Sequence, residues 1–196
     1  MKVEPVVLSN DFVRLEPLLP THREPLRVVA ADPELWRFHA QNHHGATFDA
    51  WFDLSLRLLD TGEGICFVVI DAASGEIAGS SSYLAVVPAH KRLEIGSTWY
   101  PKPFQGGSTN PATKLALMSH AFEALAFNRV EFKLDSRNAQ SWAAMRKLGA
   151  TQEGIFRRHL VLPDGYKRDS VYFSVIAEEW PSVKAGIAAR LSSFKG

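Results

Sequence analysis

The segment 94–127 constrains the fold most, because a β-rich run leads through a glycine-containing loop into a long helical pattern. The loop reads Gln105, Gly106, Gly107, Ser108, Thr109 and Asn110. Paired glycines leave backbone N–H groups unshielded, and a helix N-terminus adds about half a positive charge. Such a loop can cradle a phosphate, although it is more often only a turn. It has neither the Lys of a P-loop nor the three spaced glycines of a Rossmann fingerprint.

Strand and helix patterns alternate along the first half of the chain. A short strand at 12–17 precedes one helix at 21–31 and a second helix that Thr47 caps and Gly62 breaks. Three β-rich runs then predict an antiparallel meander: 65–71, 76–86 and 92–100. The alternation predicts a mixed α/β fold.

The second half repeats the alternation with longer helices. Asn110 and Pro111 predict a helix start, because a capping side chain stands before a proline at the first helical position. This helix should end near Phe127. The remaining expected elements are a strand at 129–134, a helix at 138–148 ended by Gly149, strands at 155–162 and 170–176 around a Pro163-Asp164-Gly165 turn, and a helix near 181–191.

Size and charge exclude several classes of protein. The 196 residues, 46% of them hydrophobic, suffice for one domain spanning 1–196. Twenty-two Lys and Arg against 21 Asp and Glu give a net charge of +1 without a basic stripe, which argues against a nucleic-acid partner. No secretory leader pattern opens the chain, and no apolar stretch is long enough to cross a membrane. We therefore expect a cytoplasmic protein without a membrane partner.

Neither the single cysteine nor the histidines predict a reactive centre. Cys66 lies in an apolar run and has no second cysteine to pair with, which favours a buried small hydrophobe. His39, His43 and His44 cluster after Trp36, but no third ligand element follows at metal spacing. We expect no metal site.

Asn138 and Ser141 lie three residues apart and face the same way at the start of a predicted helix. This pair could contact a ligand beside the loop described above. Asn138 could equally be an ordinary N-cap.

Short motifs at fixed spacing, dense over 92–181 and thinner before it, carry a resemblance to a known family. They are Val13-Arg14-Leu15-Glu16-Pro17-Leu18, Leu93-Glu94-Ile95-Gly96, the loop 105–110 with Lys114 and Leu115, Asn128-Arg129-Val130, Asn138-x-x-Ser141, Lys147-Leu148-Gly149-Ala150, Glu153-Gly154, Asp169-Ser170 and Glu179-Trp180. Together they resemble the GNAT superfamily of acetyl-CoA-dependent N-acetyltransferases. The nearest branch is named for enzymes that acetylate the N-termini of ribosomal proteins.

The resemblance implies an α+β fold with a central mixed, mostly antiparallel sheet of about seven strands, splayed in the middle and flanked by helices. The pantetheine arm of CoA would lie in the gap and contact the free backbone edges of Thr98, Trp99 and Tyr100. Asn138 would form a hydrogen bond with it. The pyrophosphate would sit on the amides that follow Gln105, those of Gly106, Gly107, Ser108, Thr109 and Asn110. Acetyl-CoA is then the cosubstrate, and no metal is implied.

The chain departs from the family pattern in two places. The usual signature has Gly where Ser108 stands and Gly or Ala where Asn110 stands, so Ser108 is expected to adopt a glycine-like conformation or the loop to shift. Many members carry a Tyr where this chain has Met145, which cannot protonate a leaving thiolate. Ser141 is the nearest replacement, and we expect its hydroxyl to hydrogen-bond the sulfur.

The implied reaction is direct attack of a primary amine on the thioester in a ternary complex. The acceptor could be a peptide N-terminus, an amino acid or a small amine. Glu94 is the candidate base, because it shares a strand face with Gly96 and Thr98 and could line the cleft. The alternative is that Glu94 is only a solvated carboxylate on the strand. A main-chain N–H of 98–100 would donate a hydrogen bond to the developing oxyanion. The candidate walls of the acceptor pocket are Trp36, Phe38 and His39, unless these residues belong to the core.

Two other classes of function stay open. The chain could be a non-catalytic acyl-CoA-binding or sensing domain, since the usual tyrosine is missing. It could also be a nucleotide- or phosphate-binding module, which would leave the Asn138 and Ser141 pair unused. A homodimer is also left open.

Overall fold

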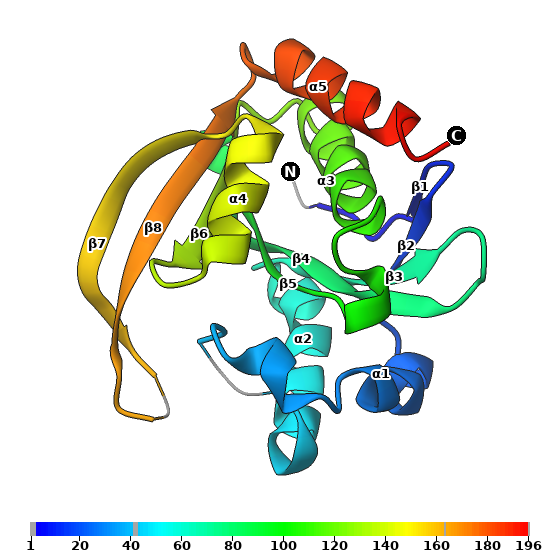
Figure 1. The fold of residues 1–196 in the computed structure, drawn as a ribbon, viewed down its shortest axis with the longest axis vertical. Helices are drawn as coiled ribbons and strands as arrows, with labels where there is room; N and C mark the ends of the chain where they lie inside the picture. Colours follow the sequence, from blue (N-terminus) through cyan, green and yellow to red (C-terminus); the bar gives the residue numbers. More distant parts are fainter. Residues whose placement is uncertain (1–2, 41–42, 163, 196) are drawn as a thin grey trace.

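A computed structural model describes residues 3–40, 43–162 and 164–195, and it contains one eight-stranded sheet with helices on both faces (Figure 1). The strand order is β1-β2-β3-β4-β5-β6-β8-β7. The strands are β1 Leu8–Ser9, β2 Val13–Pro17, β3 Ile65–Asp71, β4 Ile77–Val87, β5 Arg92–Trp99, β6 Arg129–Asp135, β7 Thr151–Val161 and β8 Lys167–Ile176. The helices are α1 Arg23–Val29, α2 Phe48–Thr61, α3 Thr109–Ser119, α4 Ala139–Leu148 and α5 Trp180–Ser192. The predicted mixed α/β fold is confirmed, with the short β1 as an additional strand.

The sheet opens between β5 and β6. These strands run parallel and pair from Arg92 with Arg129 to Glu94 with Glu131, whereas the other neighbouring strands are antiparallel. A parallel pair needs a long crossover connection, and α3 lies within it. Because β5 continues to Trp99 and β6 to Asp135 beyond the paired residues, the two strands diverge.

Helices cover the two faces unevenly. On one face α3 and α5 pack on the sheet through side chains such as Leu117 and Ile187. On the other, α1 and α2 cover β3 and the end of β5 with Leu26, Trp51 and Phe52. Figure 1 shows that neither α1 nor α2 extends over the long β7–β8 hairpin, which lies apart from them.

Local sequence explains the limits of α2. Its buried residues Phe48, Trp51, Phe52 and Ser55 follow helical spacing, so one face of the helix is buried. Thr47 stands at the predicted N-cap position, but its side chain makes no capping hydrogen bond, and its hydroxyl donates instead to the His44 carbonyl. Gly62 ends the helix with φ 75°, which glycine adopts without a steric cost.

The start of α3 differs from the sequence prediction. The helix begins at Thr109 with Ser108 at the N-cap position, so Asn110 and Pro111 lie within the first turn. Of the two alternatives expected for Ser108, the glycine-like conformation is wrong, because Ser108 has φ −75° and Gly106 takes the positive φ of 77°. After Ser119 the helix continues as a wider π turn over His120–Ala124.

The C-terminal hairpin is longer than predicted. It extends from Thr151 to Ile176, because antiparallel pairing continues beyond the hydrophobic runs on which the prediction relied. Pro163 of the predicted turn lies outside the described residues, while Gly165 has φ 81° and donates its N–H to the Leu162 carbonyl. None of the helices in the described part of the chain is long and apolar enough to cross a membrane.

Candidate active site

A cleft of about 790 Å³ occupies the gap between the diverging strands. Residues 94–99 of β5 and the following Tyr100 line one side, and residues 132–135 of β6 line the other. The cleft brings together most of the predicted site residues: Glu94, Thr98, Trp99, Tyr100, Gln105, Gly106, Gly107, Asn110, Asn138 and Ser141. Ser108 and Thr109 are not among its lining residues, and Thr109 is buried at the helix start.

An extra residue in β5 shapes the cleft wall. Gly96 pairs with Ser82 and Trp99 with Ser80, so three steps along β5 match two along β4. Ser97 takes φ 45°, a left-handed conformation that is uncommon for a residue with a side chain. Bulges of this kind redirect backbone groups beside functional sites. Since β4 pairs with one edge of β5, the other edge of 95–99 borders the gap.

The loop before α3 presents bare backbone to the cleft. A Cβ added at Gly106 or Gly107 would meet no atom within 4 Å, so open space lies over both. Ser108 makes no capping hydrogen bond with its side chain, which leaves the first amides of α3 for another acceptor. Gln105 anchors the loop, as its Nε2 donates to the Tyr100 carbonyl at 2.6 Å. This geometry suits a pyrophosphate group.

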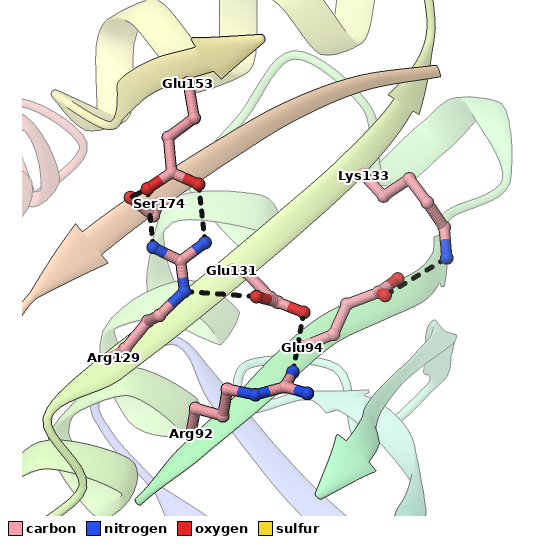
Figure 2. Close-up of polar contacts among 7 residues, drawn as sticks. All are labelled: Arg92, Glu94, Arg129, Glu131, Lys133, Glu153 and Ser174. Atoms are coloured by element: carbon pink, nitrogen blue, oxygen red, sulfur yellow. Dashed lines mark hydrogen bonds and ion pairs between the residues drawn. The ribbon is translucent and has the colours of Figure 1, made fainter. Parts of the chain in front are cut away.

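Glu94 is buried, with 6% of its surface exposed, so it is not a solvated carboxylate. Its Oε2 accepts a hydrogen bond from Lys133 Nζ at 3.2 Å (Figure 2). A Cβ at position 96 would lie 2.7 Å from Glu94 Oε1, so the glycine there makes room for the carboxylate. Figure 2 also shows an ionic chain formed by Arg92 of β5, Glu131 and Arg129 of β6, and Glu153 of β7.

Lys114 of α3 is a cleft residue that the sequence did not single out as functional. It is 4% exposed, and its Nζ donates to Thr98 Oγ1 at 3.0 Å. Burial lowers the pKa of Lys114 to about 7, although the nearby charge of Glu94 acts to raise that pKa. Its i, i+4 spacing from Asn110, which also lines the cleft, places it on the cleft side of the helix, a signal available in the sequence.

Asn138 is the N-cap of α4, as the simpler interpretation predicted. Its Oδ1 accepts from the Ser141 N–H at 3.0 Å, so that oxygen is already engaged. Ser141 is half-buried and lines the cleft, as does the buried Met145 that stands where the family often has a tyrosine. Ser141 precedes Met145 by four residues, so the two side chains lie on the same face of α4.

The far end of the cleft lies under the segment between α1 and α2. Phe38, His39 and His43 line it, whereas Trp36 belongs to the core. Burial lowers the pKa of His39 to about 4, with further lowering by the charges of His43 and Arg168, so His39 is neutral at pH 7. Arg168 of β8 also reaches the cleft, and sequence analysis missed it because the predicted strand began after it.

No group of three His, Cys, Asp or Glu side chains within 3–40, 43–162 and 164–195 is placed to hold a metal ion. Cys66 is buried, its Sγ lies 3.3 Å from Ser80 Oγ, and burial raises the pKa of the thiol. A raised thiol pKa disfavours the nucleophilic thiolate.

Comparisons with known proteins agree with this geometry. Residues 13–151 match the family described as an acetyltransferase (GNAT) domain. The chain is 32% identical over 110 residues to YdaF of Bacillus subtilis, named as a candidate ribosomal N-acetyltransferase, and this match covers 56% of the chain and 59% of that relative.

Two solved structures share the whole fold. A candidate acetyltransferase from T. thermophilus is 39% identical with a TM-score of 0.86, over 97% of this chain and all (100%) of that one. Mycobacterium smegmatis RimJ, solved in complex with CoA-disulfide, has a TM-score of 0.81 over 94% of both chains, and its 22% identity supports the fold alone. The chain therefore belongs to the GNAT family of acetyltransferases.

Proposed function

We propose that this protein transfers an acetyl group from acetyl-CoA to a primary amine by direct attack within a ternary complex. The observation that carries the proposal is the cleft at the opening of the sheet. On one side it offers bare backbone and uncapped helix amides, and on the other it holds the buried carboxylate of Glu94.

The backbone groups are suited to hold CoA. The amides of 106–110 would bind the pyrophosphate, and the free edge of Thr98, Trp99 and Tyr100 would bind the pantetheine as an added strand would. Asn138 would donate a hydrogen bond from its amide nitrogen, because its oxygen caps α4. RimJ, which has the same fold, was solved with a CoA compound, and this supports the assignment.

Glu94 would accept the proton of the attacking amine, directly or through water. An ammonium has no lone pair, and at pH 7 only about a tenth of an α-amino group of pKa near 8 is neutral. A base in the cleft therefore raises the reactive fraction. The ion pair with Lys133 holds the carboxylate in position.

Acetyl-CoA supplies an activated thioester. A main-chain N–H of 98–100 would stabilise the negative charge that develops on its carbonyl oxygen, an effect worth about 3 to 4 kcal/mol in other enzymes. The Ser141 hydroxyl would hydrogen-bond the leaving sulfur, since Met145 cannot donate.

The test measures thiol release from acetyl-CoA over a panel of amines that includes peptide N-termini, amino acids and small amines. The proposal expects acceptor-dependent release, with mass spectrometry showing one added acetyl group on the acceptor. Calorimetry of CoA binding runs in parallel. Tight CoA binding with no turnover on any amine would instead identify an acyl-CoA-binding domain, and no CoA binding would remove both interpretations.

A further inference from the structure

Arg168 is a buried cation at the acceptor end of the cleft. Its side chain is 5% exposed and lines the cleft together with Asp135 and His39. Strand alternation places it on the same sheet face as Tyr172 and, across the β6–β8 pairing, Lys133. A guanidinium stays charged at every working pH, so its burial is costly unless an anion compensates for it.

The protein compensates this charge incompletely. The nearest carboxylate oxygen is Asp135 Oδ2 at 4.0 Å, and Nε of Arg168 has no hydrogen-bond partner among the described residues. Both oxygens of Asp135 already accept hydrogen bonds from the Arg137 guanidinium, at 3.1 and 2.8 Å.

The other carboxylate in this part of the cleft is also engaged. Glu94 accepts from Lys133, and the remaining nearby titratable groups are Tyr172, His43, the neutral His39 and the cationic or neutral Lys114. Asp32 and Glu34 also line the cleft, but Asp32 is half-buried and Glu34 is exposed. The two buried carboxylates, Asp135 and Glu94, therefore face three guanidinium or ammonium groups. These are Lys133 of β6, Arg137 between β6 and α4, and Arg168 of β8. The excess positive charge is at Arg168, where a donor is unsatisfied.

We propose that Arg168 binds a carboxylate of the acceptor, so that the substrates are amines that carry a carboxylate close to the amino group. This inference rests on the proposed function, because it concerns the acceptor of that reaction. Arg168 and Glu94 lie on the same face of the sheet with β6 between them, so one molecule would be held at its carboxylate by Arg168 and deprotonated at its amine by Glu94. Arginine suits a carboxylate because its planar N–H groups match both oxygens.

The carboxylate could come from a free amino acid or from an acidic first residue of a peptide. Two matched pairs separate these sources: alanine against alaninamide, and amidated peptides that differ only in Glu or Gln at the first position. Binding is measured by calorimetry to the protein loaded with CoA, in which no acetyl group can be transferred. At least tenfold tighter binding of the carboxylate member is expected in one pair, because charge-assisted hydrogen bonds are strong in a buried site.

Variants assign the preference to Arg168. Arg168→Met should abolish it, and Arg168→Lys should keep part of it, since the charge stays but the paired N–H groups are lost. Arg37→Met is the matched control, because Arg37 also lines the cleft but is exposed. Its loss should change the affinities for the two members of a pair equally. CoA affinity should be unchanged in all three variants.

Equal binding of both members in both pairs would overturn the proposal, as would a preference that survives Arg168→Met. If CoA affinity falls with Arg168→Met, the group that Arg168 binds is a phosphate of CoA, which also overturns it. If Arg168→Met fails to fold, the affinities of the wild type for the two pairs, together with those of Arg168→Lys, still test the proposal. Failure of acetyl transfer itself appears separately, as an absence of thiol release in a protein that binds these ligands.

Discussion

The two sides of the cleft are made of different groups. The side proposed to hold CoA consists of backbone, namely Gly106, Gly107, the first amides of α3 and the edge of β5. The side proposed to hold the acceptor consists of buried charged residues, among them Glu94 and Arg168. Backbone binding tolerates a change of side chain wherever the conformation survives, whereas a buried charge needs its own partner.

The largest expected effect is on the acceptor side, through Glu94. Glu94→Gln should lower turnover about 100-fold at pH 7, within the range of general-base contributions, and less at pH 9 where more of the amine is already neutral. Steady-state kinetics at both pH values measures this, with CoA affinity as the control. An equal loss at both pH values would assign Glu94 a structural role instead.

On the CoA side, Gly107→Val should weaken CoA binding about 30-fold, or about 2 kcal/mol, because a side chain would enter the space over the amides. The fold should be unaffected, since no atom beyond the adjoining residues lies within 4 Å of the added Cβ. Gly154→Val is a matched control at another open glycine, where CoA affinity should stay the same. Unchanged affinity of the Gly107 variant by calorimetry would remove the cradle assignment.

Lys114 lies between the two sides of the cleft, and its lowered pKa predicts that the stability of the fold depends on pH. Its pKa is about 7 in the folded protein and near 10.5 when unfolded, so the folded state binds fewer protons between these values. The free energy of unfolding should therefore rise from pH 7 to pH 9, by about 2 kcal/mol from this group. Denaturant unfolding of the wild type and of Lys114→Met should show this rise in the wild type and not in the variant. Parallel curves would show that Lys114 is not desolvated.

The smallest effect separates the two uses of Asn138. Asn138→Ala removes the cap of α4 and should cost about 1 kcal/mol of stability. Asn138→Asp keeps a capping oxygen but loses the amide donor, so its stability should match the wild type while CoA binding weakens. Thermal unfolding and calorimetry measure the two effects. If Asn138→Asp binds CoA as the wild type does, Asn138 serves only the helix.

Sequence reasoning succeeded where local rules decide the structure. The capping position of Asn138, the αL residue Gly149 and the buried stripe of α2 all follow from neighbours within a few residues. It failed at the start of α3, because Asn110 and Pro111 can occupy the first turn as well as the cap. It also placed the start of the C-terminal hairpin too late.

The site was predicted best where it depends on backbone. The glycine loop and the β5 edge were identified from short motifs, and the structure places them on one cleft. Lys114 and Arg168 were missed, because burial of a charged side chain depends on elements distant in sequence. Arg168 and Asp135, for example, are brought together only by the pairing of β6 with β8.

By itself, the sequence determined the order of strands and helices, the exposed backbone of the loop 105–110 and the family, because each depends on short-range spacing or on residue type. The tertiary structure alone decided how far β5 and β6 diverge, which charges are buried in the gap and which of them lack a partner. The physical reason is that desolvation and ion pairing depend on the distance between groups in space, which for Glu94, Lys133 and Arg168 is set by strand pairing across the sheet.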